Sequence, residues 1–296
     1  MLTGEYLVLD GASSLAIPCK LGQSLSIGQG SENELQWKSK LVDGSTWLDT
    51  VFDISKLKAN AIPHKDPIIQ MLADILRAAS LQNPDFLDGI SGKRVTTQLE
   101  FPRNWGLGSS STLIANIAEW AQIDPYTLLK NTFKGSGYDI ACAKAEKAIR
   151  YQLKEGVPFV EEVHFKPSFA NELYFVHLNQ KQNSRESIAH YSTVVKIGLQ
   201  KHADKISQIT NQIIQCSTIT QFENLLEQHE AIVSNILQTS TIKQSHFQDY
   251  PRAIKSLGGW GGDFVLAVGG PNDIAYFKKR GYKTIIPYKD MVLKTA

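Results

Sequence analysis

The stretch Pro102–Ser111, PRNWGLGSSS, connects a predicted strand to a predicted helix. The strand is Lys93–Glu100, in which apolar and polar residues alternate, and the helix is Thr112–Ala121, in which apolar residues recur at helical spacing. Glycines let a backbone approach a ligand without a Cβ clash, and the free N–H groups at a helix N-terminus attract anions. This order of elements therefore predicts a corner that binds phosphate groups.

An ordinary serine-capped helix is the alternative interpretation of this corner. The complete string, with two glycines and three serines, is much rarer than a single serine cap. It lacks the Gly-Lys-Ser/Thr ending of a Walker A loop and the spacing of a Gly-x-Gly-x-x-Gly fingerprint. The chain also has no His-Arg-Asp and Asp-Phe-Gly set, so the sequence excludes a protein kinase.

Two more glycine clusters stand before predicted elements. Gly135-Ser136-Gly137 precedes Tyr138-Asp139, with which a predicted helix over residues 138–151 begins. Residues 258–262 read GGWGG and lead into the predicted strand Phe264–Val268. A tight turn alone would need only one or two glycines, so the second cluster favours the close approach of a ligand.

Composition and charge exclude several classes of protein. The chain has 296 residues, of which 42% are hydrophobic, enough for one large core or two smaller ones. The formal net charge of +2 argues against a general nucleic-acid binder, but not against a local anion site. The widely spaced cysteines predict neither a disulfide framework nor a structural zinc site. No apolar run reaches the roughly 20 residues of a membrane helix, and the first residues do not resemble a signal peptide. We therefore expect no nucleic-acid or membrane partner and a cytoplasmic location. The expected assembly is a monomer or homodimer.

The order of the predicted strands and helices indicates an α+β fold with two domains. Meandering strands and paired helices predominate over alternating strand–helix units. Leu2–Leu9 has the pattern of a strand, and Ile219–Leu237 has the single apolar stripe of a helix. His229 lies on that stripe, so a core histidine is a better interpretation than a substrate contact. The stretch around Gly156 is the expected boundary between a domain of residues 1–155 and a domain of residues 156–296.

Taken together, the motifs resemble those of the GHMP kinases, the family of galactokinase and of homoserine, mevalonate and phosphomevalonate kinases. Pro102–Ser111 looks like the phosphate-binding motif of that family. Leu2–Leu9, with Gly-Glu-Tyr at 4–6, is similar to the first motif, and Lys255–Asp263 resembles the third, glycine-rich motif. Residues 135–141, GSGYDIA, resemble the Ser-Gly-x-Asp stretch of mevalonate and phosphomevalonate kinases, and also a subgroup known by the letters GYDIA.

The resemblance implies a fold, cofactors and a phosphate site. The implied fold is the two-domain GHMP kinase fold, with a ribosomal protein S5 domain 2-like N-terminal domain that binds the nucleotide and a ferredoxin-like C-terminal domain. The implied cofactors are ATP and Mg²⁺, and the implied partners are ATP and a small-molecule acceptor. The residues matched to the ATP phosphates are Gly106, Leu107, Gly108, Ser109, Ser110 and Ser111. Among them, Ser110 matches the Mg²⁺ ligand.

The resemblance also assigns residues to the chemistry and to the acceptor. Asp139 matches the catalytic carboxylate, which would accept the proton of the acceptor hydroxyl or orient that oxygen for in-line attack. A simple helix cap is the alternative role for Asp139. The residues expected near the acceptor are Glu5, Tyr6, Ser136, Gly137, Arg185, Gly259, Gly261 and Gly262. For Arg185, a solvated surface arginine is the stronger alternative.

Three departures from the family pattern bear on activity. The lysine that the family carries early in its first strand would fall before Met1, so either the chain lacks it or the recorded start is too late; we expect a truncated start. Leu128 stands where mevalonate kinases carry a glutamate as a second Mg²⁺ ligand. Trp260 stands where the third motif has a glycine, so its indole must point away from the loop or narrow the pocket.

From these motifs we expect an ATP-dependent kinase that transfers the γ-phosphoryl group to a hydroxyl or phosphate of a small acidic metabolite. Mevalonate or phosphomevalonate is the expected acceptor, in the mevalonate pathway of isoprenoid biosynthesis, because the Gly-Glu-Tyr and Ser-Gly-Tyr-Asp strings favour that branch. Two alternatives stay open. One is a lyase like diphosphomevalonate decarboxylase, which would also release CO₂. The other is a nucleotide-binding pseudoenzyme, which the missing lysine and glutamate favour.

Overall fold

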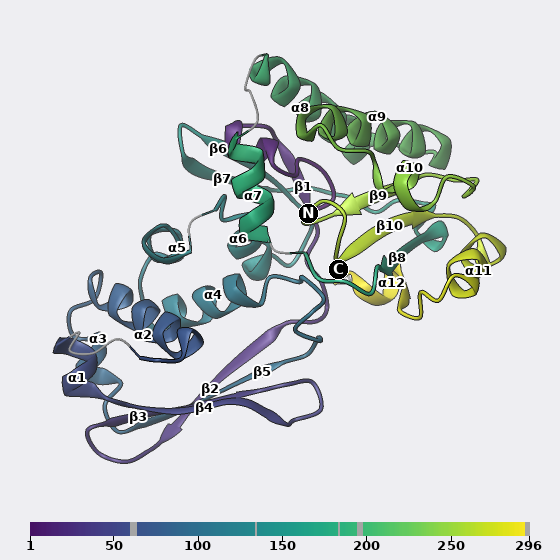
Figure 1. The fold of residues 1–296 in the computed structure, drawn as a ribbon. Helices are drawn as coiled ribbons and strands as arrows, with labels where there is room; N and C mark the ends of the chain where they lie inside the picture. Colours follow the sequence, from purple (N-terminus) through teal and green to yellow (C-terminus); the bar gives the residue numbers. More distant parts are fainter. Residues whose placement is uncertain (60–63, 134, 183, 194–197, 294–296) are drawn as a thin grey trace. The chain divides into compact units, whose positions relative to one another are not determined.

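The computed structural model describes residues 1–59, 64–133, 135–182, 184–193 and 198–293. Its helices and strands form an α+β fold that divides into two compact units (Figure 1). Unit 1 comprises Met1–Lys20, Asn104–Gly106 and Ala145–Ala296, and unit 2 comprises Leu21–Arg103 and Leu107–Lys144. Within the described ranges, no helix combines the length and the apolar character that crossing a bilayer requires.

Unit 2 contains a four-stranded sheet in the order β2-β5-β3-β4. Its strands are β2 (Gln23–Gln29), β3 (Glu34–Lys40), β4 (Thr46–Asp53) and β5 (Lys93–Leu99). Strands β3 and β5 run parallel, and the other neighbours run antiparallel. Along β5 the residues Val95, Thr97 and Leu99 are buried and alternate with partly exposed neighbours, because successive side chains of a strand point to opposite faces.

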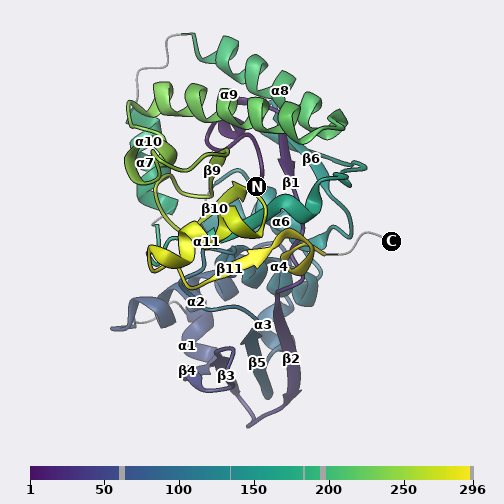
Figure 2. The same ribbon diagram turned by 90° about the vertical axis from the view of Figure 1, so that its right-hand side faces the viewer.

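The helices of unit 2 supply the other half of its core. They are α1 (Ile54–Ala59), α2 (Pro67–Ser80), α3 (Phe86–Gly89), α4 (Ser109–Ala121), α5 (Pro125–Thr132) and α6 (Tyr138–Lys144). In Figures 1 and 2, α2 and α4 lie together on one side of the sheet. Their apolar faces, including Ile75, Leu76 and Ile117, pack with Trp37 and Val95 of the sheet in one buried cluster. This packing fixes the N-terminus of α4 relative to the sheet.

Unit 1 contains two sheets. A three-stranded sheet has the order β1-β6-β7, formed by β1 (Ser14–Ala16), β6 (Ile149–Lys154) and β7 (Val157–Glu162). A four-stranded sheet has the order β11-β8-β10-β9, formed by β8 (Leu173–His177), β9 (Ile254–Leu257), β10 (Phe264–Val268) and β11 (Ile285–Pro287). All of these neighbours are antiparallel. The central strand β10 is buried along its whole length.

Helices cover the sheets of unit 1. The longest are α8 (Leu199–Gln215) and α9 (Ile219–Leu237), which lie side by side in Figures 1 and 2. The shorter elements are η1 (Leu7–Asp10), η2 (Ala170–Glu172), α7 (Ser184–Thr193), α10 (Ile242–His246), α11 (Pro271–Lys279) and α12 (Tyr288–Met291). Buried residues such as Ile206, Phe222 and Leu226 join the helix pair to the first residues of the chain in one core.

Two predicted elements are wrong, and both errors have a local cause. Leu2–Leu9 is not a strand: Thr3 makes one isolated bridge, to Leu15, and η1 follows. Gly4 and Tyr6 have positive φ values of 92° and 63°, which end an extended conformation. The helix predicted over 138–151 ends as α6 at Lys144, because the alternating residues from Ile149 onward form β6.

The two units do not follow the predicted boundary between residues 155 and 156. Gly156 lies in the turn between β6 and β7, which pair with each other inside unit 1. Its φ of 78° suits a tight hairpin turn, which accounts for the glycine signal in the sequence. Unit 1 instead joins both ends of the chain, an arrangement that local sequence patterns do not reveal.

Candidate active site

The predicted phosphate corner is the N-terminus of α4. Gly108 is the N-cap residue and has a φ of 75°, a conformation that suits glycine. It has no side chain to satisfy the free N–H groups of the first helical turn, so these groups remain available to an anion. Thr112 Oγ1 donates to Gln23 Oε1 at 2.7 Å and ties that turn to β2. The Ser110 side chain is exposed, whereas Ser109 and Ser111 are half-buried.

Asp139 lies directly beside this corner, within unit 2. A Cβ built on Gly108 would be 3.5 Å from Asp139 Oδ1 and 3.6 Å from its Cγ. Asp139 is the second residue of α6, and burial raises the pKa of its carboxyl above the ordinary value of 3.8. The Asp139 carboxylate and the N-terminus of α4 therefore lie close together within unit 2.

The residues before Asp139 form the start of α6. Gly137 is buried, has a φ of 81°, and its carbonyl accepts from the N–H groups of Ile140 and Ala141 at 3.1 and 3.2 Å. Ser136 precedes it and is half-buried. The glycine thus turns the chain into the helix at the position that brings Asp139 to Gly108.

The third glycine cluster forms a loop in unit 1 between β9 and β10. Gly258 and Gly261 have φ values of 74° and 84°. Gly259 and Gly262 pack against Gln182: a Cβ on either residue would come within 2.4 or 2.6 Å of a Gln182 side-chain carbon. These two glycines are therefore needed for close packing on the segment after β8. We name residues 258–262 the glycine loop.

Asp263 is a buried carboxylate that the sequence analysis did not assign to the site. It follows the glycine loop with a φ of 55°, and its Oδ1 accepts from the Gln182 N–H at 3.1 Å. A Cβ on Gly106 would be 2.3 Å from Asp263 Cγ, so only glycine fits at position 106. Burial raises the pKa of the Asp263 carboxyl. The sequence feature that could have identified Asp263 is its position directly after the glycines of residues 258–262, within the motif Lys255–Asp263.

Tyr6 contacts the glycine loop. The backbone N–H of Trp260 donates to Tyr6 Oη at 2.8 Å, and burial raises the pKa of the phenol, which therefore keeps its proton. Both residues line a pocket of about 260 Å³ in unit 1, together with Gln182, Ser187 and His190. The Trp260 indole donates to the Ser240 carbonyl at 3.1 Å, so it turns away from the loop backbone and forms a wall of the pocket.

Of Glu5 and Arg185, two residues predicted near the acceptor, the structure describes the side chain of Glu5 alone. The Glu5 side chain is buried and pairs with Lys255 at 2.7 Å. Arg185 belongs to α7, and its side chain lies outside the part of the chain that the structure describes. His229 is fully buried and accepts from the Gly4 N–H at 2.9 Å, which agrees with its interpretation as a core histidine.

Ligands for a metal ion are few. Among the described residues, no group of three or more His, Cys, Asp or Glu side chains is arranged to hold a metal ion. Leu128 is fully buried in the core of unit 2, as an apolar residue is expected to be. The exposed hydroxyl of Ser110 at the α4 N-terminus fits a single Mg²⁺ contact, since hydroxyl oxygens suit this cation.

The fold is shared with solved kinases of the GHMP class. Mevalonate kinase of Methanococcus jannaschii superposes with a TM-score of 0.68 at 15% identity, over 96% of this chain and 93% of that one. Phosphomevalonate kinase of Streptococcus pneumoniae, solved with phosphomevalonate and AMPPNP, gives 0.66 at 16% identity, over 94% and 92%. Galactokinase of Lactococcus lactis, solved with galactose, gives 0.67 at 12% identity, over 94% and 85%.

No protein-family model and no curated protein sequence matches the chain. The three superpositions confirm the predicted resemblance to GHMP kinases at the level of the fold. The GYDIA subgroup stays a prediction.

Proposed function

We propose that this protein is an ATP-dependent small-molecule kinase of the GHMP type. The observation that carries the proposal is the closeness of the Asp139 carboxylate to Gly108, because a Cβ added there would lie 3.5 Å from Oδ1, at the N-terminus of α4. Phosphoryl transfer needs an anion cradle and a group that readies the acceptor oxygen, close to each other. The shared fold with kinases of sugars and of the mevalonate pathway agrees with this chemistry.

In this proposal, the ATP phosphates bind to the backbone N–H groups of residues 107–111, with Gly106 before them. Gly108 lets the phosphates approach the helix end, which a side chain would block. The hydroxyls of Ser109 and Ser111 add donors, and Ser110 would hold Mg²⁺. Bound Mg²⁺ neutralises charge on the phosphate oxygens.

Asp139 acts on the acceptor. The acceptor oxygen attacks the γ-phosphorus, the bond from that phosphorus to the β–γ bridging oxygen breaks, and ADP leaves. The hydroxyl proton passes to the Asp139 carboxylate, which must be ionised to receive it. The raised pKa of Asp139 makes it a stronger base than an exposed aspartate.

The acceptor is proposed to be mevalonate or phosphomevalonate. In unit 2 the proposed contacts are Ser136 and Gly137, next to Asp139. In unit 1 they are Tyr6 and the glycine-loop residues Gly259, Gly261 and Gly262, with Arg185 for an acidic group. The structural similarity to mevalonate kinase and phosphomevalonate kinase supports this class of acceptor. Because galactokinase is a structural neighbour too, a sugar is the comparison acceptor. We also propose a cytoplasmic monomer or homodimer with the S5-like and ferredoxin-like domains named above.

Two other functions are separated from the kinase by one assay. Release of ADP is measured with mevalonate, phosphomevalonate, diphosphomevalonate and galactose, and CO₂ is collected in parallel. ADP that depends on one acceptor, without CO₂, supports the kinase. ADP with stoichiometric CO₂ from diphosphomevalonate supports the lyase. Binding of an ATP analogue without turnover on any acceptor, also in a variant with a Gly-Lys pair added before Met1, supports the pseudoenzyme, which the buried Leu128 favours.

A further inference from the structure

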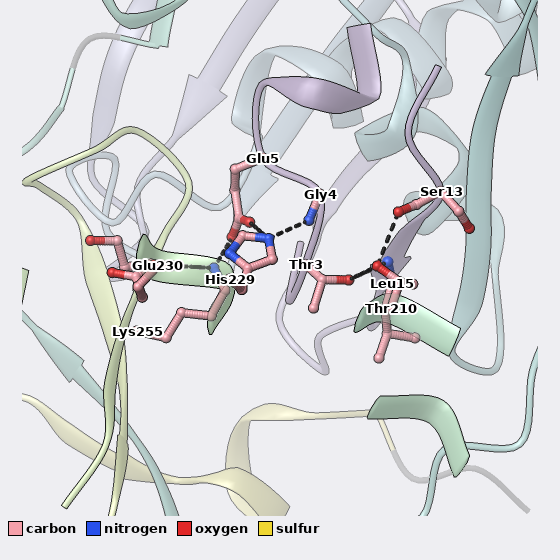
Figure 3. A network of polar contacts seen from close by, with 10 residues as sticks. Thr3, Gly4, Glu5, Ser13, Leu15, Thr210, His229, Glu230 and Lys255 are labelled. Atoms are coloured by element: carbon pink, nitrogen blue, oxygen red, sulfur yellow. Dashed lines mark hydrogen bonds and ion pairs between the residues drawn. The ribbon is translucent and has the colours of Figure 1, made fainter. Parts of the chain in front are cut away.

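A cluster of four ionisable side chains is buried next to the pocket of unit 1. Glu5 comes from the segment before η1, His229 and Glu230 come from α9, and Lys255 comes from β9. Their side chains are only 5%, 0%, 3% and 1% exposed. Figure 3 shows them pointing toward one another from three separate parts of the chain. None of these groups takes part in the proposed transfer step.

The cluster contains one firm ion pair. Lys255 Nζ lies 2.7 Å from Glu5 Oε1, donates to the Ser256 carbonyl at 2.8 Å, and is 3.7 Å from Glu230 Oε1. One lysine balances one carboxylate, and burial raises the pKa of Glu230 to about 8, so Glu230 keeps its proton near neutral pH. His229 is neutral, because burial lowers its pKa and its Nε2 accepts from the Gly4 N–H.

Stability alone does not explain this cluster. In the described part of the chain, Glu5 Oε2, Ser256 Oγ and His229 Nδ1 are buried without hydrogen-bond partners, which costs free energy. A buried ion pair is often no more stabilising than apolar side chains of the same size. We therefore consider that the ion pair selects one conformation of the two segments that it joins.

The residue after Glu5 has a strained backbone. Tyr6 has φ 63° and ψ −54°, and the Leu7 N–H donates to the Glu5 carbonyl at 2.8 Å. This is the γ-turn with a positive φ, which is rare because a side chain is crowded in it. Strain of this kind persists only where the surrounding contacts hold it. The Glu5 side chain, anchored on Lys255, is one of those contacts.

The strained turn aims the Tyr6 phenol at the glycine loop. Tyr6 Oη accepts from the Trp260 N–H, and Lys255 stands three residues before Gly258, where the loop begins. Two connections therefore join the same two segments: Glu5 with Lys255, and Tyr6 with Trp260. The first lies in the core and the second lies at the pocket.

We propose that Glu5 and Lys255 are positioning residues, whose ion pair holds the γ-turn at Tyr6 and thereby locks the glycine loop for binding of the acceptor. Glu5 would then act through Tyr6 and the loop and would not touch the acceptor itself. The role in acceptor binding rests on the proposed kinase function. The coupling between the ion pair and the loop is independent of it.

The experiment compares two neutral double variants. Glu5→Gln with Lys255→Met removes the buried pair without leaving a lone buried charge. Glu223→Gln with Arg252→Met removes a second ion pair of unit 1, between α9 and the segment before β9, at 2.8 Å. Glu5→Asp is a milder variant that keeps the charge and shortens its reach. Amide hydrogen exchange of peptides covering residues 258–263, the melting temperature, and the kcat and KM for the acceptor are measured on each full chain.

The proposal predicts exchange at the Trp260 amide about tenfold faster in the Glu5/Lys255 double variant, and measurably faster in Glu5→Asp, with no change in the Glu223/Arg252 variant. The acceptor KM should rise at least about fivefold while affinity for an ATP analogue stays constant. Unchanged exchange in residues 258–263 of a folded Glu5 variant would overturn the proposal. If no acceptor is turned over at all, the kinase function fails, and the exchange result still decides the coupling.

Discussion

The carboxylate of Asp139 lies against Gly108, the N-cap residue of α4, at a distance that leaves room for a Cβ but for little more. The contact brings together two segments that lie 31 positions apart in the chain, from residue 108 to residue 139. It is built inside unit 2 by the packing of α4 and α6 on the same core. The proposed chemistry depends on this contact more than on any other feature.

Replacement of Gly108 tests the phosphate cradle. Gly108→Val places methyl groups between the helix N-terminus and the Asp139 carboxylate, so affinity for an ATP analogue should fall by about tenfold or more. Gly44→Val is the matched control, because Gly44 has a φ of 79° in the β3–β4 turn and nothing lies within 4 Å of its added Cβ. Calorimetric titration of both variants measures the difference. Equal affinity for the ATP analogue in the two variants would show that the phosphates do not bind at the N-terminus of α4.

The pH dependence of turnover tests the state of Asp139. As a base, Asp139 works only when ionised, so kcat/KM should fall as the pH falls through its pKa. Burial raises that pKa above 3.8, so the acidic limb should lie above the range of an exposed aspartate. A pH–rate profile of the enzyme with its acceptor measures the limb. A limb at or below the ordinary aspartate value would show that Asp139 is not the titrating base.

The pH dependence of stability tests the buried Glu230. Its pKa is raised from 4.5 to about 8, so its contribution to stability is complete below pH 4.5 and is lost as the pH rises toward 8. Glu230→Gln should therefore gain a few degrees in melting temperature relative to the wild type at pH 8, and little or nothing at pH 5. Lys255, Glu5 and His229 are the charged or titratable groups that face it.

Glu227→Gln is the control for this prediction, because Glu227 lies on the same helix but is exposed and pairs with Lys243. Its melting temperature should follow that of the wild type at both pH values. If Glu230→Gln shows the same difference from the wild type at pH 5 and pH 8, the raised pKa is wrong.

Much of the fold could be predicted from local patterns. The single apolar stripe of Ile219–Leu237 placed α9 at its observed bounds, and strands β5 and β10 follow from alternation and from an apolar run. The prediction of a strand at Leu2–Leu9 was wrong because Gly4 and the γ-turn at Tyr6 bend this segment, although its composition is typical of a strand. The expected boundary at Gly156 coincides with a hairpin turn between β6 and β7, because hairpin turns and domain linkers use the same residue types.

The closeness of Gly108 and Asp139 could be predicted from the motifs that contain them, and their roles stay predictions. The role of Asp263 against Gly106 was not, because it depends on a contact between residues 157 positions apart. The Glu5–Lys255 pair joins residues 250 positions apart, and only the folded core brings them together. In both cases a buried charged side chain contacts a residue far away in the chain, and a single sequence does not predict which residue that is.

The most direct test of the proposed mechanism is a comparison of Asp139→Asn with Asp124→Asn. Asp124 caps α5 in the same unit, and asparagine caps a helix about as well, so the control should behave as the wild type. Acceptor-dependent ADP release and affinity for an ATP analogue are measured on both variants. Asp139→Asn should lose turnover by a factor of about 10² to 10⁴ while its nucleotide affinity is unchanged. Turnover at the wild-type rate in Asp139→Asn would contradict it.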